Sequence, residues 1–290
     1  MNDFIDNLSP FPLRLEIELV SDCNLQCVYC PRQYLPRLKG YIDFGLFKKL
    51  IDEAEGHPET IIVLHRRGES MLHPRFKEML NYISGKFKEV QMATNATLLN
   101  EDKFQPLISA LTFLSFSLDT PEIYDRTRIP ASYLRIEEKI LKFLEFNNGR
   151  VKTQASMVKT ERTLPEDCET FKQIWQRRVD RVRIYEKHSL NGKFGSLQNP
   201  RSSRKSCVMP FYEMLVYEDG IIGRCNHDWN GNPMGDVKQK QIKEIWHNQK
   251  YKDLRNQHRQ LKLTDSVCLN CDSWYPEIGW QGIGEVVKKK

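Results

Sequence analysis

The chain has 290 residues, of which 40% are hydrophobic, 28% charged and 10% aromatic. This composition predicts a globular protein with a substantial core and excludes collagen, coiled coils and wholesale disorder. The net charge of +6 comes from 44 Lys and Arg residues interleaved with 38 Asp and Glu residues, and it fits a solvated surface as well as an anionic partner. No apolar run reaches the roughly 18 residues of a membrane span, and the N-terminus lacks the basic start and cleavage site of a secretory signal. We therefore expect a cytoplasmic protein with no membrane partner.

Short apolar strands alternate with amphipathic helices through the first two thirds of the chain. The strands are predicted at residues 13–20, 61–64, 90–94, 111–118, 151–158 and 182–185. The helices between them are predicted at residues 44–54, 73–84, 101–108, 136–146 and 165–177. Such an alternation predicts an α/β fold with a parallel sheet.

The pattern changes after residue 185. Residues 191–206 are rich in Asn, Gly, Pro and Ser, which indicates a linker. Beyond the linker, residues 214–217 and 221–224 flank Glu218, Asp219 and Gly220, and this arrangement predicts a β-hairpin. We therefore expect two units, residues 1–195 and residues 196–290.

Three cysteines follow the first predicted strand directly. Cys23, Cys27 and Cys30 lie within eight residues, at the edge of a parallel sheet where α/β proteins place their chemistry. Three thiolates on one loop suit an iron–sulfur cluster or zinc. No fourth ligand is adjacent, so the centre has either an open coordination position or a distant fourth partner. A structural zinc site and a disulfide are the alternative interpretations.

This cysteine spacing, with the aromatic Tyr29 before the third cysteine, resembles the radical S-adenosylmethionine (radical SAM) superfamily. The resemblance implies a partial (β/α)6 TIM-type barrel and a 4Fe–4S cluster on Cys23, Cys27 and Cys30. It also implies that the iron without a protein ligand binds the amine and carboxylate of S-adenosylmethionine. Cleavage of that cofactor after one-electron reduction would give a 5'-deoxyadenosyl radical.

Further segments at strand ends are similar to the superfamily's cofactor-binding motifs. Its Gly-Gly-Glu-Pro turn corresponds to residues 67–70, where Gly68 and Glu69 match and the first and last residues differ. The resemblance implies that Glu69 binds the ammonium of S-adenosylmethionine. A carboxylate suits a cation, although an acid at the N-terminus of a helix is the structural alternative.

The next two strands and the segment beyond them supply three more candidates. Asn95 lies in a segment similar to Thr-Asn-Gly in which Ala96 replaces the glycine, and Ser117 lies in a segment similar to Ser-Leu-Asp. Arg128 resembles the arginine that pairs with the cofactor carboxylate. For each of these three residues a turn or capping role is the alternative, but their placement at consecutive strand ends favours a cofactor site.

A second cysteine set lies after the linker and comprises Cys207, Cys225, Cys268 and Cys271. Four thiolates can fill all positions of one metal centre, and a zinc ribbon is one such structure. The spacing, with Gly220 before Cys225 and a final Cys-x2-Cys pair, resembles the SPASM and twitch domains of radical SAM enzymes. That resemblance implies one auxiliary 4Fe–4S cluster, held by a β-hairpin and a helix.

Cys168 is the remaining cysteine, in the first turn of a predicted helix. Such a position lowers a thiol pKa, and some relatives donate a hydrogen atom from such a thiol, although a small buried hydrophobic role is the simpler interpretation. Other polar residues that would line the pocket are His65, Arg66, His188, His227, Asp228 and Trp229.

The resemblance implies hydrogen-atom abstraction from a substrate carbon. An auxiliary cluster that accepts an electron favours a two-electron oxidation, and we expect the substrate to be a small alcohol, sugar or aminocyclitol. We expect no leader-binding domain, because only about a dozen residues precede the first strand. A flavodoxin- or ferredoxin-type protein is the expected electron donor.

Several other functions remain open from the sequence. An epimerase, a decarboxylase, or a peptide- or protein-modifying maturase would use the same cofactors. A non-catalytic zinc or metal-binding protein is the non-enzymatic alternative. The scattered basic residues argue against a nucleic-acid partner, because no basic face with interleaved aromatic residues is evident. The sequence indicates no oligomeric state.

Overall fold

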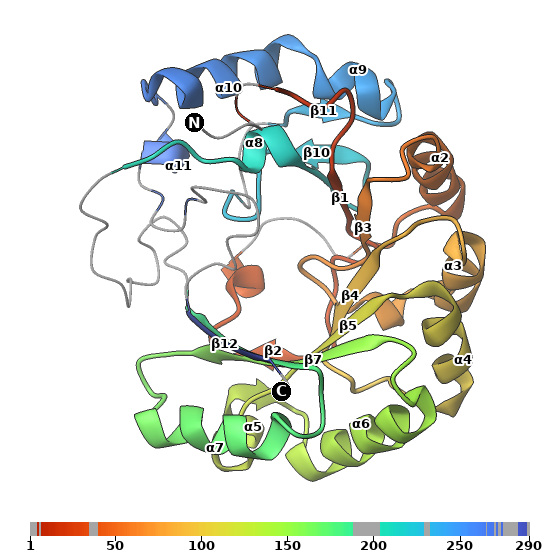
Figure 1. The fold of residues 1–290 in the computed structure, drawn as a ribbon, viewed down its shortest axis with the longest axis vertical. Helices are drawn as coiled ribbons and strands as arrows, with labels where there is room; N and C mark the ends of the chain where they lie inside the picture. Colours follow the sequence, from red (N-terminus) through yellow and green to blue (C-terminus); the bar gives the residue numbers. More distant parts are fainter. Residues whose placement is uncertain are drawn as a thin grey trace.

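The structure, a computed structural model, describes residues 5, 7–34, 40–187, 204–228, 233–264, 266–269, 271, 274 and 284–288. Six parallel strands form its central sheet (Figure 1). Their order follows the chain, and they are β1 (Arg14–Ile17), β3 (Ile61–Val63), β4 (Val90–Thr94), β5 (Phe113–Ser117), β7 (Lys152–Lys159) and β8 (Arg181–Glu186). The six strands predicted from the sequence are all present.

Helices cover the outer face of this sheet, as Figure 1 shows. The five predicted helices are α2 (Phe44–Glu55), α3 (Phe76–Ile83), α4 (Glu101–Ala110), α6 (Tyr133–Asn147) and α7 (Pro165–Trp175). A short helix that was not predicted, α5 (Pro121–Thr127), has proline in its first turn, where the missing N–H costs no hydrogen bond. The strands and helices form a partial (β/α)6 TIM-type barrel.

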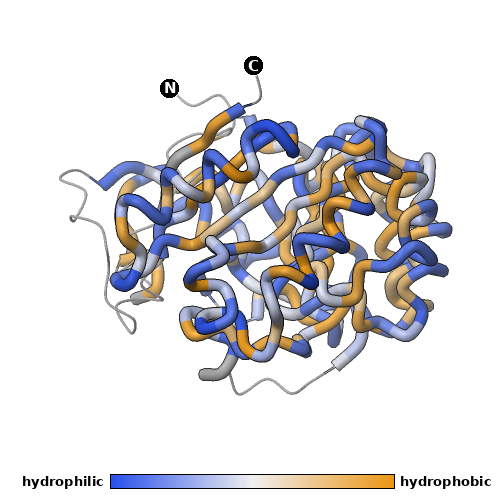
Figure 2. Tube along the Cα trace, turned by 90° about the horizontal axis from the view of Figure 1, so that it is seen from below, coloured by the Kyte–Doolittle hydropathy of each residue, from blue (hydrophilic) through white to orange (hydrophobic). Residues whose placement is uncertain are grey.

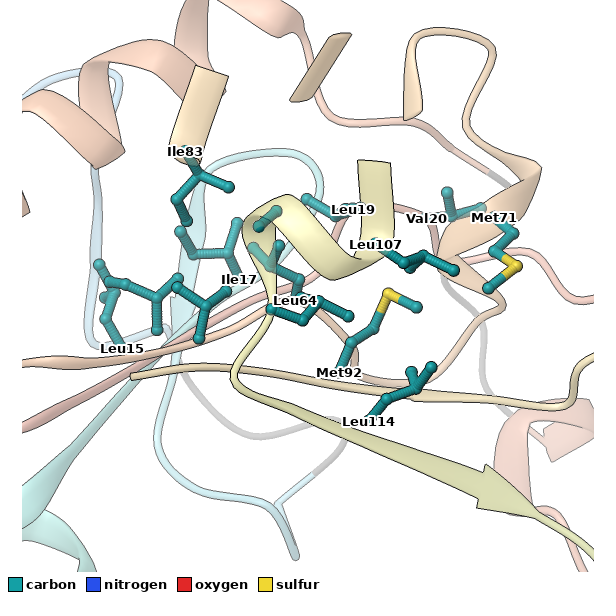
Figure 3. Packing of buried hydrophobic residues seen from close by; sticks show 14 of the residues in the cluster. Leu15, Ile17, Leu19, Val20, Leu64, Met71, Ile83, Met92, Leu107 and Leu114 are labelled. Carbon is teal, nitrogen blue, oxygen red and sulfur yellow. The ribbon is translucent and has the colours of Figure 1, made fainter. Parts of the chain in front are cut away.

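The core of the barrel lies between the sheet and the helices, because strand residues alternate between its two faces. Leu15 and Ile17 of β1 are fully buried in the hydrophobic cluster. In Figure 3 the apolar side chains of β1, β4 and β5 lie beside Ile83 of α3 and Leu107 of α4. Along the outer helices hydrophobic and hydrophilic residues alternate (Figure 2). The inner face of the sheet is therefore free to carry polar residues.

The predicted hairpin is present, and it extends the barrel sheet. Its strands β9 (Glu213–Val216) and β10 (Ile221–Gly223) are antiparallel, and β9 pairs in parallel with β1. β11 (Gly235–Asp236) follows β10, and β12 (Gly284–Lys288) pairs antiparallel with β8 at the other edge. The predicted boundary at residues 195 and 196 lies outside the described residues and stays a prediction.

The remaining elements lie outside the ten-stranded sheet, and β2 belongs to the cysteine loop. β2 (Gln26–Cys27) pairs with β6 (Arg128–Ile129) in a small separate sheet. Near the hairpin and the second cysteine set lie α8 (Met209–Tyr212), α9 (Ile242–Trp246), α10 (Gln249–Gln260) and α11 (Ser266–Leu269). The 3-10 helices are η1 (Pro31–Tyr34) and η2 (Ser70–Leu72).

Among the described residues, no helix combines the length and the apolar character needed to cross a membrane.

Candidate active site and cluster-binding centres

A cavity of about 540 Å³ lies inside the barrel. All nine residues predicted for the first cluster and for S-adenosylmethionine line it: Cys23, Cys27, Cys30, Tyr29, Gly68, Glu69, Asn95, Ser117 and Arg128. Eight of them come from the loop after β1 and from the ends of β3, β4 and β5, because the carboxyl ends of parallel strands meet at one edge of the sheet, and Arg128 comes from β6. The structure thus brings the separate sequence motifs together.

The cysteine loop is held at both ends. The β2–β6 ladder places Cys27 opposite Arg128. Arg32 donates hydrogen bonds to the Asp22 carboxylate (3.2 Å) and to the carbonyl oxygen of Cys23 (3.3 Å). The sulfur of Cys23 faces the backbone N–H of Leu25 (3.5 Å), a contact that favours a thiolate. Three thiols on a fixed loop, all free of disulfides, fit an iron–sulfur cluster.

Burial raises the pKa of the thiols of Cys23, Cys27 and Cys30. A metal centre removes that penalty because thiolates are its ligands and their protons are released on binding. These three cysteines are therefore better suited to bind a cluster as thiolates than to remain as protonated thiols.

Gly68 and Glu69 form a turn packed against the end of β1. A Cβ atom on Gly68 would collide with the carbonyl oxygens of Val20 and Asp22, so glycine is required for this close approach. The backbone N–H of Glu69 donates to the same Asp22 oxygen (2.8 Å). Contact with the segment that leads into the cysteine loop therefore fixes the backbone path of the turn.

The Glu69 carboxylate is buried and accepts three hydrogen bonds, from Thr94 Oγ1 (2.9 Å), Asn95 N (2.7 Å) and Met71 N (3.2 Å). Burial raises the pKa of Glu69, and these hydrogen bonds oppose the rise. The bond to Met71 is the helix-capping role considered from the sequence, here at η2. The carboxylate also lines the cavity, so capping and cation binding are compatible.

The two departures from the superfamily turn have partners of their own. Arg67 donates from Nε to Glu18 (2.7 Å) and from Nη2 to Glu218 (3.2 Å), and its guanidinium lies 4.1 Å from the centre of the Tyr217 ring. Ser70 donates to the carbonyl oxygen of Leu64 (2.6 Å). Both side chains therefore have structural roles that replace those of glycine and proline.

Arg128 is held by Asp119 at the edge of the cavity. Its Nε donates to Asp119 (3.0 Å) and its Nη2 to the carbonyl oxygen of Leu118 (2.9 Å), while the Tyr29 hydroxyl donates to the same carboxylate (3.0 Å). Burial alone would lower the pKa of Arg128, but the charge of Asp119 raises it. Arg128 is thus a fixed cation beside the cysteine loop.

The second cysteine set also converges. Cys207, Cys225, Cys268 and Cys271 line one small cavity. The N–H of Cys207 donates to His258 Nδ1 (3.2 Å), and burial strongly raises the pKa of the Cys225 thiol. None of these four cysteines is in a disulfide, and a set of four thiols around one space has the composition of an iron–sulfur cluster site.

The two cavities are neighbours. His227 lines both of them, and Arg66 of the barrel donates from Nη2 to the carbonyl oxygens of Asn226 (3.1 Å) and Cys225 (3.4 Å). These two bonds connect the segment before the Gly68–Glu69 turn to Cys225 of the second cysteine set and to the residue that follows it. Sequence analysis did not predict this link, since it depends on contacts between distant segments.

Cys168 is not brought to either cavity. It is buried in the hydrophobic core on α7, with 8% of its surface exposed, which fits the buried hydrophobic role. Its assignment as a hydrogen-atom donor stays a prediction. Of the other candidates, His65, Arg66 and His227 line the large cavity, whereas Asp228 is absent from the described lining. His188 and Trp229 lie outside the described residues.

Sequence analysis missed the polar residues deep in the barrel. Among them Arg14, Gln91, Gln154 and Arg181 line the cavity from the first residues of their strands. A signal was available, because strands of a parallel sheet are commonly apolar on both faces. Polar residues at alternate positions of such strands indicate an internal binding site.

These features define an α/β barrel in which three cysteine thiols line the large cavity and four more line a small neighbouring one. The family model described as "Radical SAM superfamily" matches residues 17–174, more than half of the chain, and the SPASM model, described as "Iron-sulfur cluster-binding domain", matches residues 207–272. The chain belongs to the radical SAM superfamily and has a C-terminal SPASM domain. This membership implies S-adenosylmethionine, a 4Fe–4S cluster and an auxiliary iron–sulfur cluster as cofactors.

Individual relatives differ in what they act on. The chain is 24% identical to the S-adenosyl-L-methionine-dependent 2-deoxy-scyllo-inosamine dehydrogenase of Niallia circulans, over 89% of this chain and 92% of that protein. It is 34% identical to a tungsten-containing aldehyde ferredoxin oxidoreductase cofactor-modifying protein of Pyrococcus furiosus, over 36% of this chain and 30% of that protein. The chain thus spans under a third of the length of the latter.

Solved structures share the fold. The structure of BtrN in complex with AdoMet and 2-DOIA superimposes with a TM-score of 0.60 at 19% identity, covering 89% of this chain and 92% of BtrN. Streptococcus suis SuiB bound to the precursor peptide SuiA gives a TM-score of 0.70 at 15% identity, covering 92% of this chain and 71% of SuiB.

Proposed function

We propose that this radical SAM enzyme oxidises a small hydroxyl-bearing molecule, such as an alcohol, sugar or aminocyclitol, by two electrons. The polar interior of the barrel carries this proposal. Gln91, Ser115, Gln154 and Ser156 line the cavity together with several guanidinium groups. Such a wall offers many hydrogen-bond donors and acceptors to hydroxyl groups. Buried polar side chains are costly unless they are hydrogen-bonded, so a polar barrel interior indicates a polar ligand.

When bound, the cofactors would supply the 5'-deoxyadenosyl radical that takes a hydrogen atom from the carbinol carbon and an auxiliary cluster that takes the remaining electron. The chain's own residues bind and orient the reactants. Glu69 would hold the ammonium of S-adenosylmethionine, and Asn95, Ser117 and Arg128 would surround the rest of it. The buried walls of the cavity would exclude water from the radical.

Oxidation of an alcohol also releases the hydroxyl proton, which needs an acceptor. Among the described lining residues the carboxylates are Glu69 and Glu186. Glu69 already accepts three hydrogen bonds, so we assign the proton to Glu186. This carboxylate lies at the end of β8, with one oxygen 3.6 Å from the ammonium of Lys159.

The decisive experiment is anaerobic reconstitution followed by assays of iron, sulfide and zinc and by electron paramagnetic resonance. About eight irons in two distinguishable clusters are expected. Four irons with one zinc would remove the proposed electron acceptor and contradict the oxidation. A flavodoxin- or ferredoxin-type protein is the proposed source of the first electron, tested by its ability to replace dithionite in cofactor cleavage.

Variants of the two cysteine sets separate the two roles. In Cys27→Ala we expect no formation of 5'-deoxyadenosine, because the first cluster loses a ligand. In Cys271→Ala we expect one cluster to be lost while some cofactor cleavage continues without product. Retained cleavage in the first variant, or unchanged iron content in the second, would contradict the assignments.

A peptide- or protein-modifying reaction is the second candidate. Its support is the likeness to SuiB with its precursor peptide and the partial match to the P. furiosus cofactor-modifying protein. Epimerisation and decarboxylation would use the same cofactors. Mass spectrometry of the products formed with a small substrate distinguishes a loss of two hydrogens from these alternatives.

A further inference from the structure

We propose that Arg181 anchors a carboxylate or phosphate group of the substrate deep in the barrel. This inference rests on the proposed function, because it assumes that the cavity receives a small molecule. It narrows the substrate to a hydroxyl compound that also carries an oxyanion, such as a sugar acid or a sugar phosphate.

Charge pairing singles out this residue among the cations of the cavity. Arg14 pairs with Glu213 (2.8 Å), and Arg66 faces Glu16 (3.6 Å). The other paired cations of the lining are Arg67 with Glu18 and Glu218, Arg128 with Asp119, and Lys187 with Glu161. Arg181 alone among these lining cations makes no ion pair with a carboxylate in the described part of the chain.

Neighbouring residues fix the Arg181 guanidinium without neutralising it. Its Nε donates to Gln154 Oε1, and the Gln154 amide donates in turn to Ser115 Oγ (2.9 Å). The guanidinium lies 4.7 Å from the centre of the Phe113 ring. Within the described residues, neither terminal nitrogen of Arg181 has a hydrogen bond. A planar guanidinium with both terminal nitrogens available is suited to bidentate binding of an oxyanion.

The electrostatic environment agrees with this geometry. Nearby carboxylates raise the pKa of Arg14 and Arg66 despite burial, whereas burial lowers the pKa of Arg181. Tyr185 and Glu89 oppose this lowering of the pKa, and neither forms an ion pair with Arg181. A partly buried cation is unfavourable unless it is paired with an opposite charge, and a bound anion would supply that charge.

The position of Arg181 also suits a substrate anchor. Sheet register places Ser117 level with Ser156 and Arg183, and Arg181 lies two residues before Arg183 on β8. Two residues of a strand span about 7 Å. The backbone of Arg181 therefore lies about one such span below the level of Ser117, and a cavity of about 540 Å³ leaves room for a monosaccharide-sized substrate with its reacting carbon toward the radical.

This assignment disfavours an aminocyclitol, because an ammonium group would be repelled by an unpaired guanidinium. The carboxylate and the phosphate ester share the same recognition chemistry and are separated by the experiment. Arg181, Gln154 and Phe113 lie on strands β8, β7 and β5 of the barrel wall.

Binding is tested on the reconstituted protein with S-adenosylmethionine and without reductant, so that no turnover occurs. The calorimetric probes are D-gluconate, D-glucose 6-phosphate, neutral D-glucose and cationic D-glucosamine. We expect one anionic probe to bind at least tenfold more tightly than the neutral and cationic probes. Which of the two anions binds identifies the carboxylate or the phosphate. Equal binding of all four probes, or no binding of either anion, would overturn the proposal.

Substitutions of Arg181 then test whether this residue is responsible for anion binding. Arg181→Gln should weaken the preferred anion at least tenfold, and Arg181→Lys should restore part of it, because the charge returns without the bidentate geometry. Arg178→Gln is the control, since Arg178 pairs with Glu137 on the outside of the barrel. Circular dichroism verifies folding, and if Arg181→Gln does not fold, Arg181→Lys with weakened binding carries the test. Unchanged anion binding in either folded variant contradicts the proposal.

Reduction with dithionite separates this inference from the proposed oxidation. An anion that binds through Arg181 but yields no product lacking two hydrogens would contradict the oxidation and leave the anchor in place. Oxidation of a neutral or cationic probe that is insensitive to Arg181→Gln would overturn the anchor alone.

Discussion

Gly68 lies where the cofactor turn passes closest to the end of β1, and the backbone there leaves no space for a side chain. In Gly68→Ala the new methyl group would push the turn away from the carbonyl oxygens of Val20 and Asp22. We expect a loss of about 1–3 kcal/mol in the free energy of unfolding and at least tenfold weaker binding of S-adenosylmethionine, measured by calorimetry. Glu69, the next residue, would move with the turn.

Gly56 provides the matched control for this substitution. It ends α2 with φ −68°, and a Cβ atom there would meet nothing within 4 Å. Gly56→Ala should therefore bind the cofactor normally. Equal binding by the two alanine variants would show that the Gly68 contact does not position the turn.

Cys168 lies in the hydrophobic core and lines neither cavity, and this position limits the roles it can have. Because it packs in the core on α7, Cys168→Ala should cost about 1 kcal/mol of stability by removing a buried sulfur while leaving oxidation intact. Thermal unfolding and product analysis check both parts. A selective loss of hydrogen return to the substrate would instead favour an epimerase with this thiol as donor.

The cysteine loop depends on an element that was not expected, the ladder between β2 in the loop and β6, the strand that follows α5. The Arg128–Asp119 pair anchors it, with 6% and 1% of the two side chains exposed. Asp119→Asn would leave a buried guanidinium without its counter-charge, and breaking such a pair costs about 3–5 kcal/mol. We expect less iron in the first cluster after reconstitution. In the exposed pair of Arg75 and Glu78, Glu78→Gln should have little effect on stability and leave the iron content unchanged.

Local periodicity predicted the elements of the barrel but not how distant segments pair. The alternation at Leu15 and Ile17 indicates a strand, and the apolar spacing of α6 indicates a helix, because each burial pattern is contained within one segment. The pairing of β9 with β1 and of β12 with β8 depends on which sheet edges remain open after the barrel forms. A local sequence pattern does not contain this information about strand pairing.

Motif spacing predicted the site residues at the carboxyl edge, including Glu69 and Asn95, since the superfamily repeats those types there. The deep wall around Arg181 was missed because its residues belong to none of the motifs used to predict the site. Their contacts emerge only when strands far apart in the sequence become neighbours.

At the scale of the whole molecule, the two cluster-binding centres are joined by consecutive arginines. Arg66 bonds to the carbonyl oxygens of Cys225 and Asn226. In Arg66→Met we expect these carbonyls to lose their donors and the second centre to lose iron or to change its electron paramagnetic resonance signal. The first cluster should keep its iron. Loss of the first cluster instead would mean that Arg66 supports the barrel rather than the link.

Arg67 forms the second link, through Glu18 on β1 and Glu218 in the hairpin turn. Burial raises the pKa of Glu218 to about 7, the neighbouring Glu18 adds to the rise, and Arg67 opposes it. Because the ordinary value is 4.5, the folded protein binds more protons than the unfolded chain between about pH 4.5 and pH 7. This contribution to stability is present at low pH and is lost as pH rises through that window.

Glu218→Gln removes the titrating group while keeping a side chain of the same shape. Relative to the wild type, the Tm of the variant should therefore rise between pH 5 and pH 7.5, by about 2 °C for each kcal/mol of the contribution. Glu59→Gln, at a carboxylate that is 71% exposed, should show no such trend. Parallel Tm profiles for wild type and Glu218→Gln across this range would mean that Glu218 keeps its charge, and that the hairpin is joined to the barrel by a fully ionised Glu18–Arg67–Glu218 cluster.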